Sequence, residues 1–200
     1  MPVMQIEGWL MFVRISLTPS EVPELVKRHR SEYPGAEAVE QFARRLIAAN
    51  FPPAEATAFI EGVCEWGGGE RNLSRILDAG DATIAQALKS ANEAIDADDV
   101  VRAIWELQHL PHLGLSFASK VARFLAPDKC VILDSVIRSR IGYVESSEGY
   151  SEFLRDCTQL LKMLRTSPDL EASLRDRLRV CDVEAAVFMK AKEKNNNVSS

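Results

Sequence analysis

The stretch Leu110-Pro-His-Leu-Gly-Leu-Ser-Phe-Ala-Ser-Lys120 decides the fold of this chain. Apolar residues recur at helical spacing on both sides of it, over residues 100–107 and 117–125, so the stretch joins two amphipathic helices. Pro111 fixes its own φ and disfavours the α region for the residue before it, which ends the first helix. Gly114 permits the positive φ that a sharp reversal of the chain needs.

The start of the second helix is expected to bind a phosphate. Ser116 is the expected N-cap, because a serine side chain can accept a hydrogen bond from an amide of the first turn. The amides of residues 113–117 would then point outward with the positive end of the helix dipole. Backbone amides in this setting bind anions, so we expect the joint to contact a phosphate group.

The pattern Leu-Pro-x-Leu-Gly-x-x-x-Ala, residues 110–118, resembles the helix-hairpin-helix element of DNA repair proteins. Asp134 follows Gly114 at the distance typical of the helix-hairpin-helix DNA glycosylase superfamily, and the whole most resembles its 8-oxoguanine DNA glycosylase-like branch. The resemblance covers residues 98–143 well. It implies an all-α, glycosylase-like helical fold with the hairpin element at residues 98–125. It also implies DNA contacts by His112, Leu113, Gly114, Leu115, Ser116, Lys120 and Arg138.

Three positions depart from that branch. Ser116 stands where the branch has a lysine, and Val136 stands where a histidine is often found. His112 replaces the middle glycine of the hairpin. The resemblance therefore supports the fold and the contact with DNA more than it supports one particular reaction.

By the resemblance, Asp134 is the catalytic residue. A glycosylase extrudes a base from the duplex and breaks its bond to the sugar, and positive charge develops at the anomeric carbon as the base leaves. An ionised carboxylate stabilises this charge or orients an attacking water. The alternative is that Asp134 is only the N-cap of a helix beginning at Ser135, and both roles can hold at once.

The 8-oxoguanine glycosylase-like branch has a lysine where this chain has Ser116. This difference decides whether the enzyme also nicks the DNA strand or only releases the base. An amine at that position attacks the sugar, forms a Schiff base and nicks the strand. Ser116 cannot do so, and Lys120 lies one helical turn further on, where a phosphate contact or solvent exposure is expected. We therefore predict a monofunctional glycosylase that leaves an abasic site, with weak lyase activity through Lys120 as the alternative.

Aromatic and cationic side chains provide candidates for a base pocket. The three glycines after Trp66 let the backbone approach a ligand, although a helix C-cap and turn at residues 66–72 is the favoured interpretation. The candidate pocket residues are Trp66, Arg71 and Phe117. Four aromatic residues lie within or beside apolar helical stripes, which favours a position in the core for each of them. These residues are Trp66, Trp105, Phe117 and Tyr143. Leu115 or His112 is the candidate wedge into the duplex.

Composition sets the size of the fold. With 200 residues, 46% of them hydrophobic, the chain can bury a sizeable core. We predict a single helical domain over residues 1–190 and a disordered polar tail over residues 191–200. The apolar run at residues 9–13 is too short for a signal peptide or a membrane span, so we expect a cytoplasmic protein with no membrane contact. We also expect a monomer.

Cysteine spacing excludes several classes of site. The four cysteines are widely and irregularly spaced, which fits neither a disulfide framework nor a zinc or iron–sulfur site. We expect reduced core thiols, no cofactor and no bound metal. These cysteines are Cys64, Cys130, Cys157 and Cys181.

Charge is unevenly distributed along the chain. The net charge is −5, which by itself argues against a nucleic-acid partner. Residues 112–143, however, hold five basic and two acidic side chains, a net of +3, so the remainder carries −8. Positive charge is thus concentrated in the segment expected to contact DNA.

The rest of the chain reads as helices separated by turns. Residues 1–17 alternate weakly and are expected to form an edge strand or an irregular leader. About nine or ten helices are expected in all. Outside the hairpin they lie near residues 18–29, 36–49, 54–66, 73–77, 82–94, 135–141, 150–165 and 170–190.

Three functional interpretations follow from these residues. The first is a glycosylase that removes damaged bases, with removal of modified bases from phage DNA as a variant of it. The second is a helix-hairpin-helix module that binds DNA without catalysis. The third is a helical scaffold with a chance hairpin, which would show no salt-dependent DNA binding.

Overall fold

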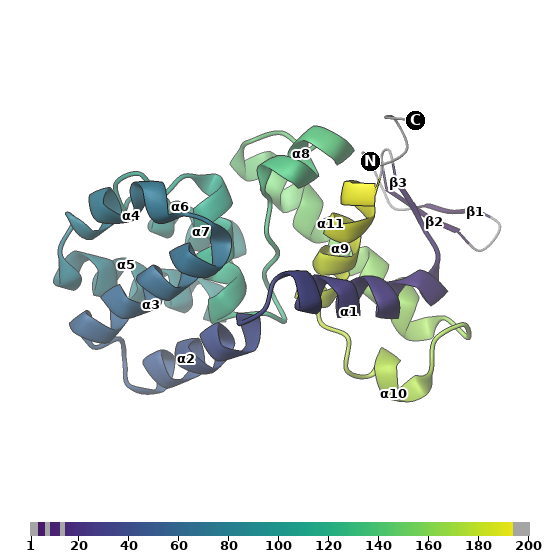
Figure 1. Cartoon of the computed structure of the whole chain (residues 1–200), viewed down its shortest axis with the longest axis horizontal. Coiled ribbons are helices and arrows are strands. Elements are labelled where there is room, and N and C mark those ends of the chain that lie inside the picture. Colours follow the sequence, from purple (N-terminus) through teal and green to yellow (C-terminus); the bar gives the residue numbers. More distant parts are fainter. Residues whose placement is uncertain (1–3, 7–8, 13–14, 194–200) are drawn as a thin grey trace. The chain divides into compact units, whose positions relative to one another are not determined.

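The computed structural model describes residues 4–6, 9–12 and 15–193, and helices dominate it (Figure 1). The helices confirm the predicted all-α fold class. A small antiparallel sheet of three strands in the order β1-β2-β3 precedes them. The strands are β1 (Met4–Ile6), β2 (Trp9–Phe12) and β3 (Ile15–Leu17). After the 3-10 turn η1 (Pro19–Glu21) the helices are α1 (Val22–Glu32), α2 (Ala36–Ala48), α3 (Pro53–Gly67), α4 (Glu70–Leu77), α5 (Asp81–Asp96), α6 (Val100–Gln108), α7 (Leu115–Leu125), α8 (Ser135–Ile141), α9 (Ser147–Thr166), α10 (Ala172–Arg175) and α11 (Val180–Glu193).

The chain divides into two compact units. The central unit consists of residues 33–132, and the terminal unit combines residues 1–32 with residues 133–200. The predicted single domain over residues 1–190 stays a prediction. Helix α11 continues to Glu193, and the rest of the predicted tail lies outside the described residues.

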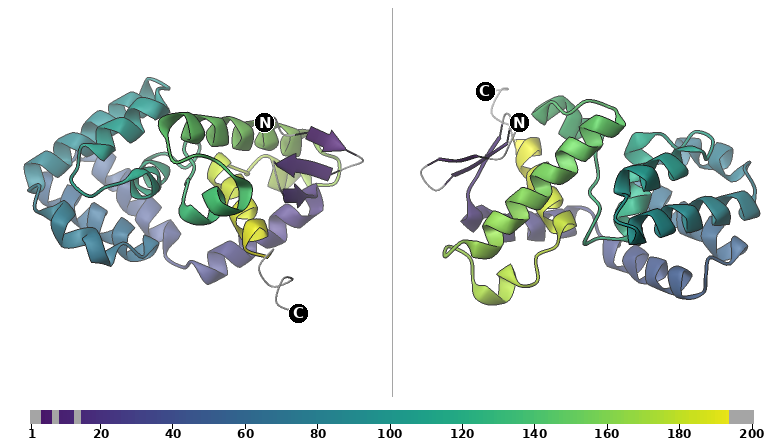
Figure 2. Two further views of the ribbon diagram at one scale, coloured as in Figure 1. Left: turned by 90° about the horizontal axis from the view of Figure 1, so that it is seen from above. Right: turned by 180° about the vertical axis from the view of Figure 1, so that it is seen from behind.

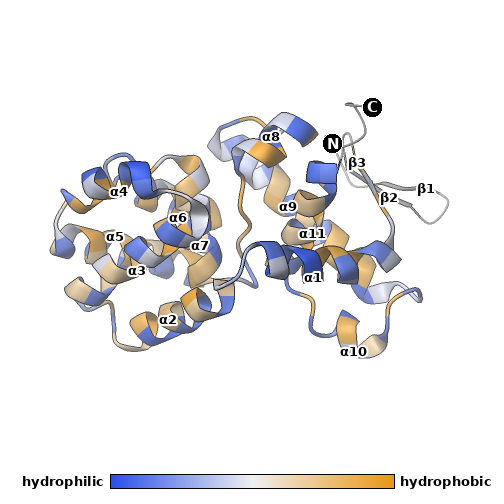
Figure 3. Cartoon of the chain, in the orientation of Figure 1, coloured by the Kyte–Doolittle hydropathy of each residue, from blue (hydrophilic) through white to orange (hydrophobic). Residues whose placement is uncertain are grey.

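The central unit is built around α3. This helix packs against α2, α5 and α7, while α6 packs against both α5 and α7. Pro53 begins α3 at a position where its missing N–H is not needed, and Gly68 ends the helix in the left-handed region with φ 71°. The side chains that meet in this core are buried, among them Phe59, Ile60, Leu88, Ile104 and Phe124. In Figure 3 these helices carry both apolar and polar colours, as amphipathic helices do.

The terminal unit is built around α11. Helices α1, α8 and α9 and strand β3 all pack against it, as the two views in Figure 2 show for α1 and α9. All residues from Val180 to Met189 are buried, so α11 is surrounded by protein. No helix among the described residues is both long and apolar enough to cross a bilayer.

The four cysteines are all buried and none forms a disulfide, which confirms the prediction of reduced core thiols. Burial raises the pKa of the Cys64 thiol to about 11, and the charge of Lys120 opposes that shift. A thiol with so high a pKa is protonated at neutral pH and is a poor nucleophile.

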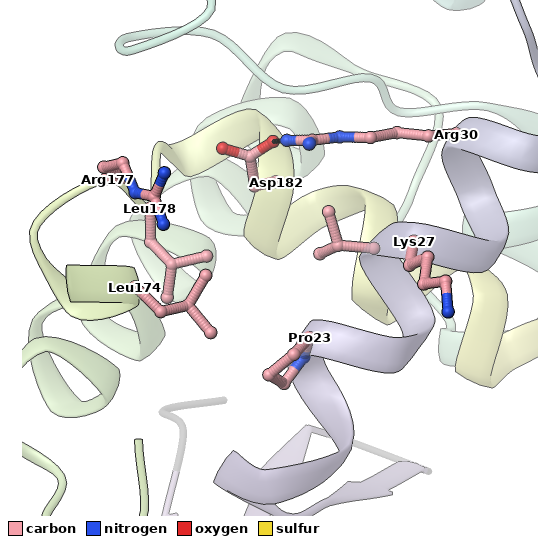
Figure 4. A pocket seen from close by; sticks show the side chains of 8 residues that line it. Pro23, Lys27, Arg30, Leu174, Arg177, Leu178 and Asp182 are labelled. Carbon is pink, nitrogen blue, oxygen red and sulfur yellow. Dashed lines mark hydrogen bonds and ion pairs between the residues drawn. The ribbon is translucent and has the colours of Figure 1, made fainter. Parts of the chain in front are cut away.

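Asp182 ties the start of α11 to α1. Its carboxylate accepts hydrogen bonds from the backbone N of Arg179 at 3.0 Å and from Nη2 of Arg30 at 3.2 Å. Burial alone would raise the pKa of Asp182, but hydrogen bonds and charge from Arg179, with the charge of Arg30, lower it overall. Figure 4 shows Arg30 reaching Asp182 from α1.

Asp182 therefore contributes acid-sensitive stability. Its folded pKa is below the unfolded value of about 3.8, so this stability is present above that pH and is lost as pH falls through the folded pKa. We expect Asp182→Asn to lower the free energy of unfolding at pH 7 by about 1–3 kcal/mol, and we expect the difference from wild type to shrink below pH 3.8. Urea unfolding at pH 7 and pH 3 measures this difference, with the exposed Asp169→Asn as the control. An undiminished difference at pH 3 would contradict the assignment.

Candidate nucleic-acid interface

Helices α6 and α7 are joined by a short hairpin, residues 109–114, within the central unit. Three leucines of this region, Leu110, Leu113 and Leu115, are buried and anchor the joint to the core. His112 and Gly114 are exposed at its surface. The side chain of Leu115 thus serves the core, so the suggestion that it wedges into a duplex is wrong.

The reversal of the hairpin occurs at a residue other than the one predicted. His112 has φ 61°, in the left-handed region, whereas Gly114 has φ −70° and ψ 171°, an extended conformation that any residue adopts. The prediction that Gly114 supplies the positive φ is therefore wrong. The turn is closed earlier, by a hydrogen bond from Leu113 N to Leu110 O at 3.2 Å, which places the left-handed residue between them.

The N-cap of α7 is Gly114, so the prediction of Ser116 is wrong. The carbonyl of Gly114 accepts hydrogen bonds from Phe117 N at 3.0 Å and Ala118 N at 2.9 Å. Burial of Leu115 sets the start of the helix, and Ser116 then lies inside its first turn. Among the described residues, no hydrogen bond uses the amides of Gly114, Leu115 or Ser116. These amides form the candidate anion-binding site.

Lys120 and Phe117 pack against the glycine segment, residues 67–69, at the C-terminal end of α3. Nζ of Lys120 donates a hydrogen bond to Gly67 O at 3.1 Å and lies 4.2 Å from the centroid of the Phe117 ring. A Cβ built on Gly69 would lie 2.3 Å from that ring, and one on Gly67 would lie 2.9 Å from Lys120. The glycines thus allow α7 to approach the end of α3 closely.

The other candidate pocket residues are Trp66, near the end of α3, and Arg71, in α4. Trp66 is half-buried, donates from Nε1 to Tyr33 O at 3.4 Å and packs edge-on against Phe124 at 4.8 Å. Arg71 is exposed in the first turn of α4, so the prediction of a loop extending through residues 70–72 is wrong. The structure brings Phe117 and Lys120 together with the glycine segment, and their role in a base pocket stays a prediction.

Asp134 is the N-cap of α8, which confirms the capping interpretation. Its Oδ1 accepts a hydrogen bond from Ile137 N at 2.9 Å, while its Oδ2 forms no hydrogen bond with any of the described residues. Arg138 donates from Nε to the backbone O of Asp134 at 3.3 Å and forms an ion pair with Glu145. Arg138 therefore holds the backbone of Asp134 in place, and its contact with DNA stays a prediction.

Trp105 is 55% exposed on α6, although its sequence context favoured the core. His109 packs edge-on against it, with ring centroids 4.0 Å apart. The polar residues Gln108 and His109, three and four positions further along, are the signal that this face of α6 points to solvent. Tyr143, by contrast, is buried as expected.

A cavity of about 300 Å³ in the terminal unit lies between α1 and the segment from α10 to α11 (Figure 4). Asp182 at its wall is committed to Arg179 and Arg30. The carboxylate of Asp182 thus stabilises the packing of α11. The lining residues are Pro23, Val26, Lys27, Arg30, Leu174, Arg177, Leu178 and Asp182.

The resemblance to DNA glycosylases rests on three features, and the structure contains all of them. They are a helical fold, a hairpin with candidate anion-binding amides, and a capping aspartate further along the chain. The family model described as "Putative 8-oxoguanine DNA glycosylase OGG-like protein" matches residues 15–188. The chain belongs to this family, which confirms the resemblance and supports a DNA glycosylase-like role with DNA as the substrate. Comparison with curated proteins and with solved structures gives no match.

Proposed function

We propose that this protein hydrolyses the N-glycosidic bond of a damaged or modified base in DNA and leaves an abasic site. The observation that carries the proposal is that the two carboxylate oxygens of Asp134 differ in their contacts. Oδ1 caps α8, whereas Oδ2 forms no hydrogen bond with any described residue. The cap fixes the position of the side chain without using both oxygens. Membership of the OGG-like family supports DNA as the substrate.

Hydrolysis needs a carboxylate at the sugar. After the nucleotide is flipped out, the bond between C1′ and the base breaks and its electron pair leaves with the base. Oδ2 of Asp134 stabilises the positive charge that develops at C1′ and orients a water. The water oxygen then bonds to C1′ and loses a proton, while the departing base takes up a proton.

Gly114 supports contact of the hairpin with the DNA backbone. Its φ of −70° does not require glycine, and a Cβ built there meets nothing within 4 Å. The fold therefore leaves room for a side chain at an exposed position that has none. A bare backbone is what close approach of a phosphate to the amides of residues 114–116 requires.

We expect Gly114→Ala to weaken DNA binding about tenfold, since it obstructs charge-assisted hydrogen bonds from the amides to a phosphate. The free energy of unfolding should change by less than about 1 kcal/mol, because the Cβ has space. Fluorescence anisotropy with labelled duplex measures binding, and urea unfolding measures stability. Gly69→Ala is the contrasting variant, since its Cβ would overlap Phe117 and destabilise the central unit. Unchanged DNA binding by Gly114→Ala would count against a phosphate-binding site at these amides.

The reaction is proposed to stop at the abasic site. Ser116 offers no amine, and the amine of Lys120 is engaged by Gly67 O and the Phe117 ring. Strand breaks should therefore appear only after alkali treatment, and borohydride should trap no covalent complex with DNA. Trapping that disappears in Lys120→Ala would show instead that Lys120 acts as a lyase amine.

A further inference from the structure

The most exposed aromatic side chain of the central unit has no role in the chemistry above. Among the described residues, the large hydrophobic side chains classed as exposed are Trp105, at 55%, and Val144, at 66%. An indole ring in water forgoes the favourable burial of a large apolar surface. A tryptophan held in this way therefore suggests a surface that becomes covered when a ligand binds.

The Trp105 ring is held in place by its neighbour His109. The two rings meet edge-on at 82°, and Nδ1 of His109 lies 2.9 Å from the carbonyl O of Trp105. Because a carbonyl only accepts hydrogen bonds, Nδ1 is the donor and the imidazole is fixed relative to the backbone. An ordered indole loses little conformational freedom when a ligand stacks on it.

The position of Trp105 relates it to the hairpin. It lies three residues before the end of α6, the helix that leads into the hairpin, so the rise of an α-helix places it about 4.5 Å from that end along the axis. Because α6 leads directly into the hairpin, a strand held at the amides of residues 114–116 would lie close to the end of α6 that carries Trp105.

The charges beside Trp105 point to an uncharged, flat ligand. On the same face, Arg102 forms an ion pair with Glu106, with Nε 3.4 Å from Oε1, so this cation is offset by a neighbouring carboxylate. The surface therefore offers an aromatic face with little net charge. Aromatic side chains of this kind stack on nucleobases regardless of sequence.

We propose that Trp105 stacks on an unstacked nucleobase of the DNA strand whose phosphate the hairpin binds. The proposal rests on the proposed function, which supplies DNA as the ligand of the hairpin and an extruded nucleotide within it. Extrusion of a nucleotide disturbs the stacking of its neighbours, so such a base is present during the proposed reaction. Trp105 then stabilises the opened strand.

The test measures binding of labelled oligonucleotides to the full chain by fluorescence anisotropy at several salt concentrations. We expect Trp105→Leu to weaken binding to single-stranded DNA about fivefold or more, with a smaller effect on a fully paired duplex. Trp105→Phe should retain most of the affinity, because phenylalanine still stacks. Val144→Ala, at the other exposed hydrophobic position, should change nothing. The dependence of affinity on salt should be unchanged in Trp105→Leu, since no phosphate contact is lost.

Equal affinity of Trp105→Leu and wild type would overturn the proposal, as would a loss that Trp105→Phe shares in full. Base release is measured on the same samples, which separates the two proposals. Release of a base together with unaltered binding by Trp105→Leu would refute the stacking role alone. No release by wild type, with binding that depends on Trp105, would refute the glycosylase alone. Absence of any DNA binding by wild type would refute both.

Discussion

Replacement of Asp134 by asparagine is expected to reduce base release by on the order of 100-fold or more while DNA binding and folding persist. The amide cannot supply the negative charge that faces the developing positive charge at C1′. It can still accept the hydrogen bond from Ile137 N that Oδ1 now accepts at 2.9 Å, because asparagine is as good an N-cap as aspartate. The measurement is single-turnover release of base from a duplex, with anisotropy for binding.

The chain offers a matched control for this substitution. Asp99 caps α6 in the same way, with Oδ1 accepting from Arg102 N at 3.0 Å, so Asp99→Asn makes the same chemical change at a helix start with no proposed reaction. We expect Asp99→Asn to release base at the wild-type rate. Equal activity of Asp134→Asn and wild type would leave Asp134 with the capping role alone.

Breaking the buried ion pair between α2 and α7 is expected to give the largest loss of stability. Nη1 of Arg123 lies 2.9 Å from Oε1 of Glu40, and both side chains are less than 10% exposed. This Nη1 lacks the alignment of a hydrogen bond, so charge attraction is the main contribution of the contact. Arg123 also lies over the Phe124 ring, at 4.5 Å from its centroid.

Glu40→Gln is expected to lower the free energy of unfolding by about 3 kcal/mol or more, because it leaves a buried guanidinium without its counter-charge. The double variant Glu40→Met with Arg123→Met should be more stable than the sum of its single variants implies, since it removes both charges together. Urea unfolding followed by circular dichroism measures all of them. As a control, Glu106→Gln breaks the more exposed pair with Arg102 and should cost less than about 1 kcal/mol. A similar small cost for Glu40→Gln would show that the pair is dispensable.

The sequence predicted the elements of the hairpin better than their detailed geometry. The helix pattern, the break at Pro111 and the cap at Asp134 are local signals, and the structure contains all three. Gly114 was assigned the positive φ because glycine permits it, but permission is not a requirement, and the buried leucines place the reversal at His112 instead. The same packing sets the helix start at Leu115 and overrides the capping preference of Ser116.

Tertiary contacts account for what local patterns missed around the candidate site. The approach of Phe117 and Lys120 to Gly67 and Gly69 joins helices far apart in the sequence, so no spacing rule predicts it. Trp105 was assigned to the core because apolar residues surround it in the sequence. The buried face of α6 in fact runs through Ala103, Ile104 and Leu107, which leaves the tryptophan on the opposite side.

The most direct test of the glycosylase proposal is mass spectrometry of free base released from DNA that carries a panel of damaged and hypermodified bases. Wild-type protein and Asp134→Asn are incubated in parallel, and the DNA is divided for treatment with and without alkali. We expect one released base with wild type, strand breaks only after alkali, and no release with Asp134→Asn. Binding of the same DNA without release of any base would contradict this expectation and identify the chain as a non-catalytic DNA-binding module.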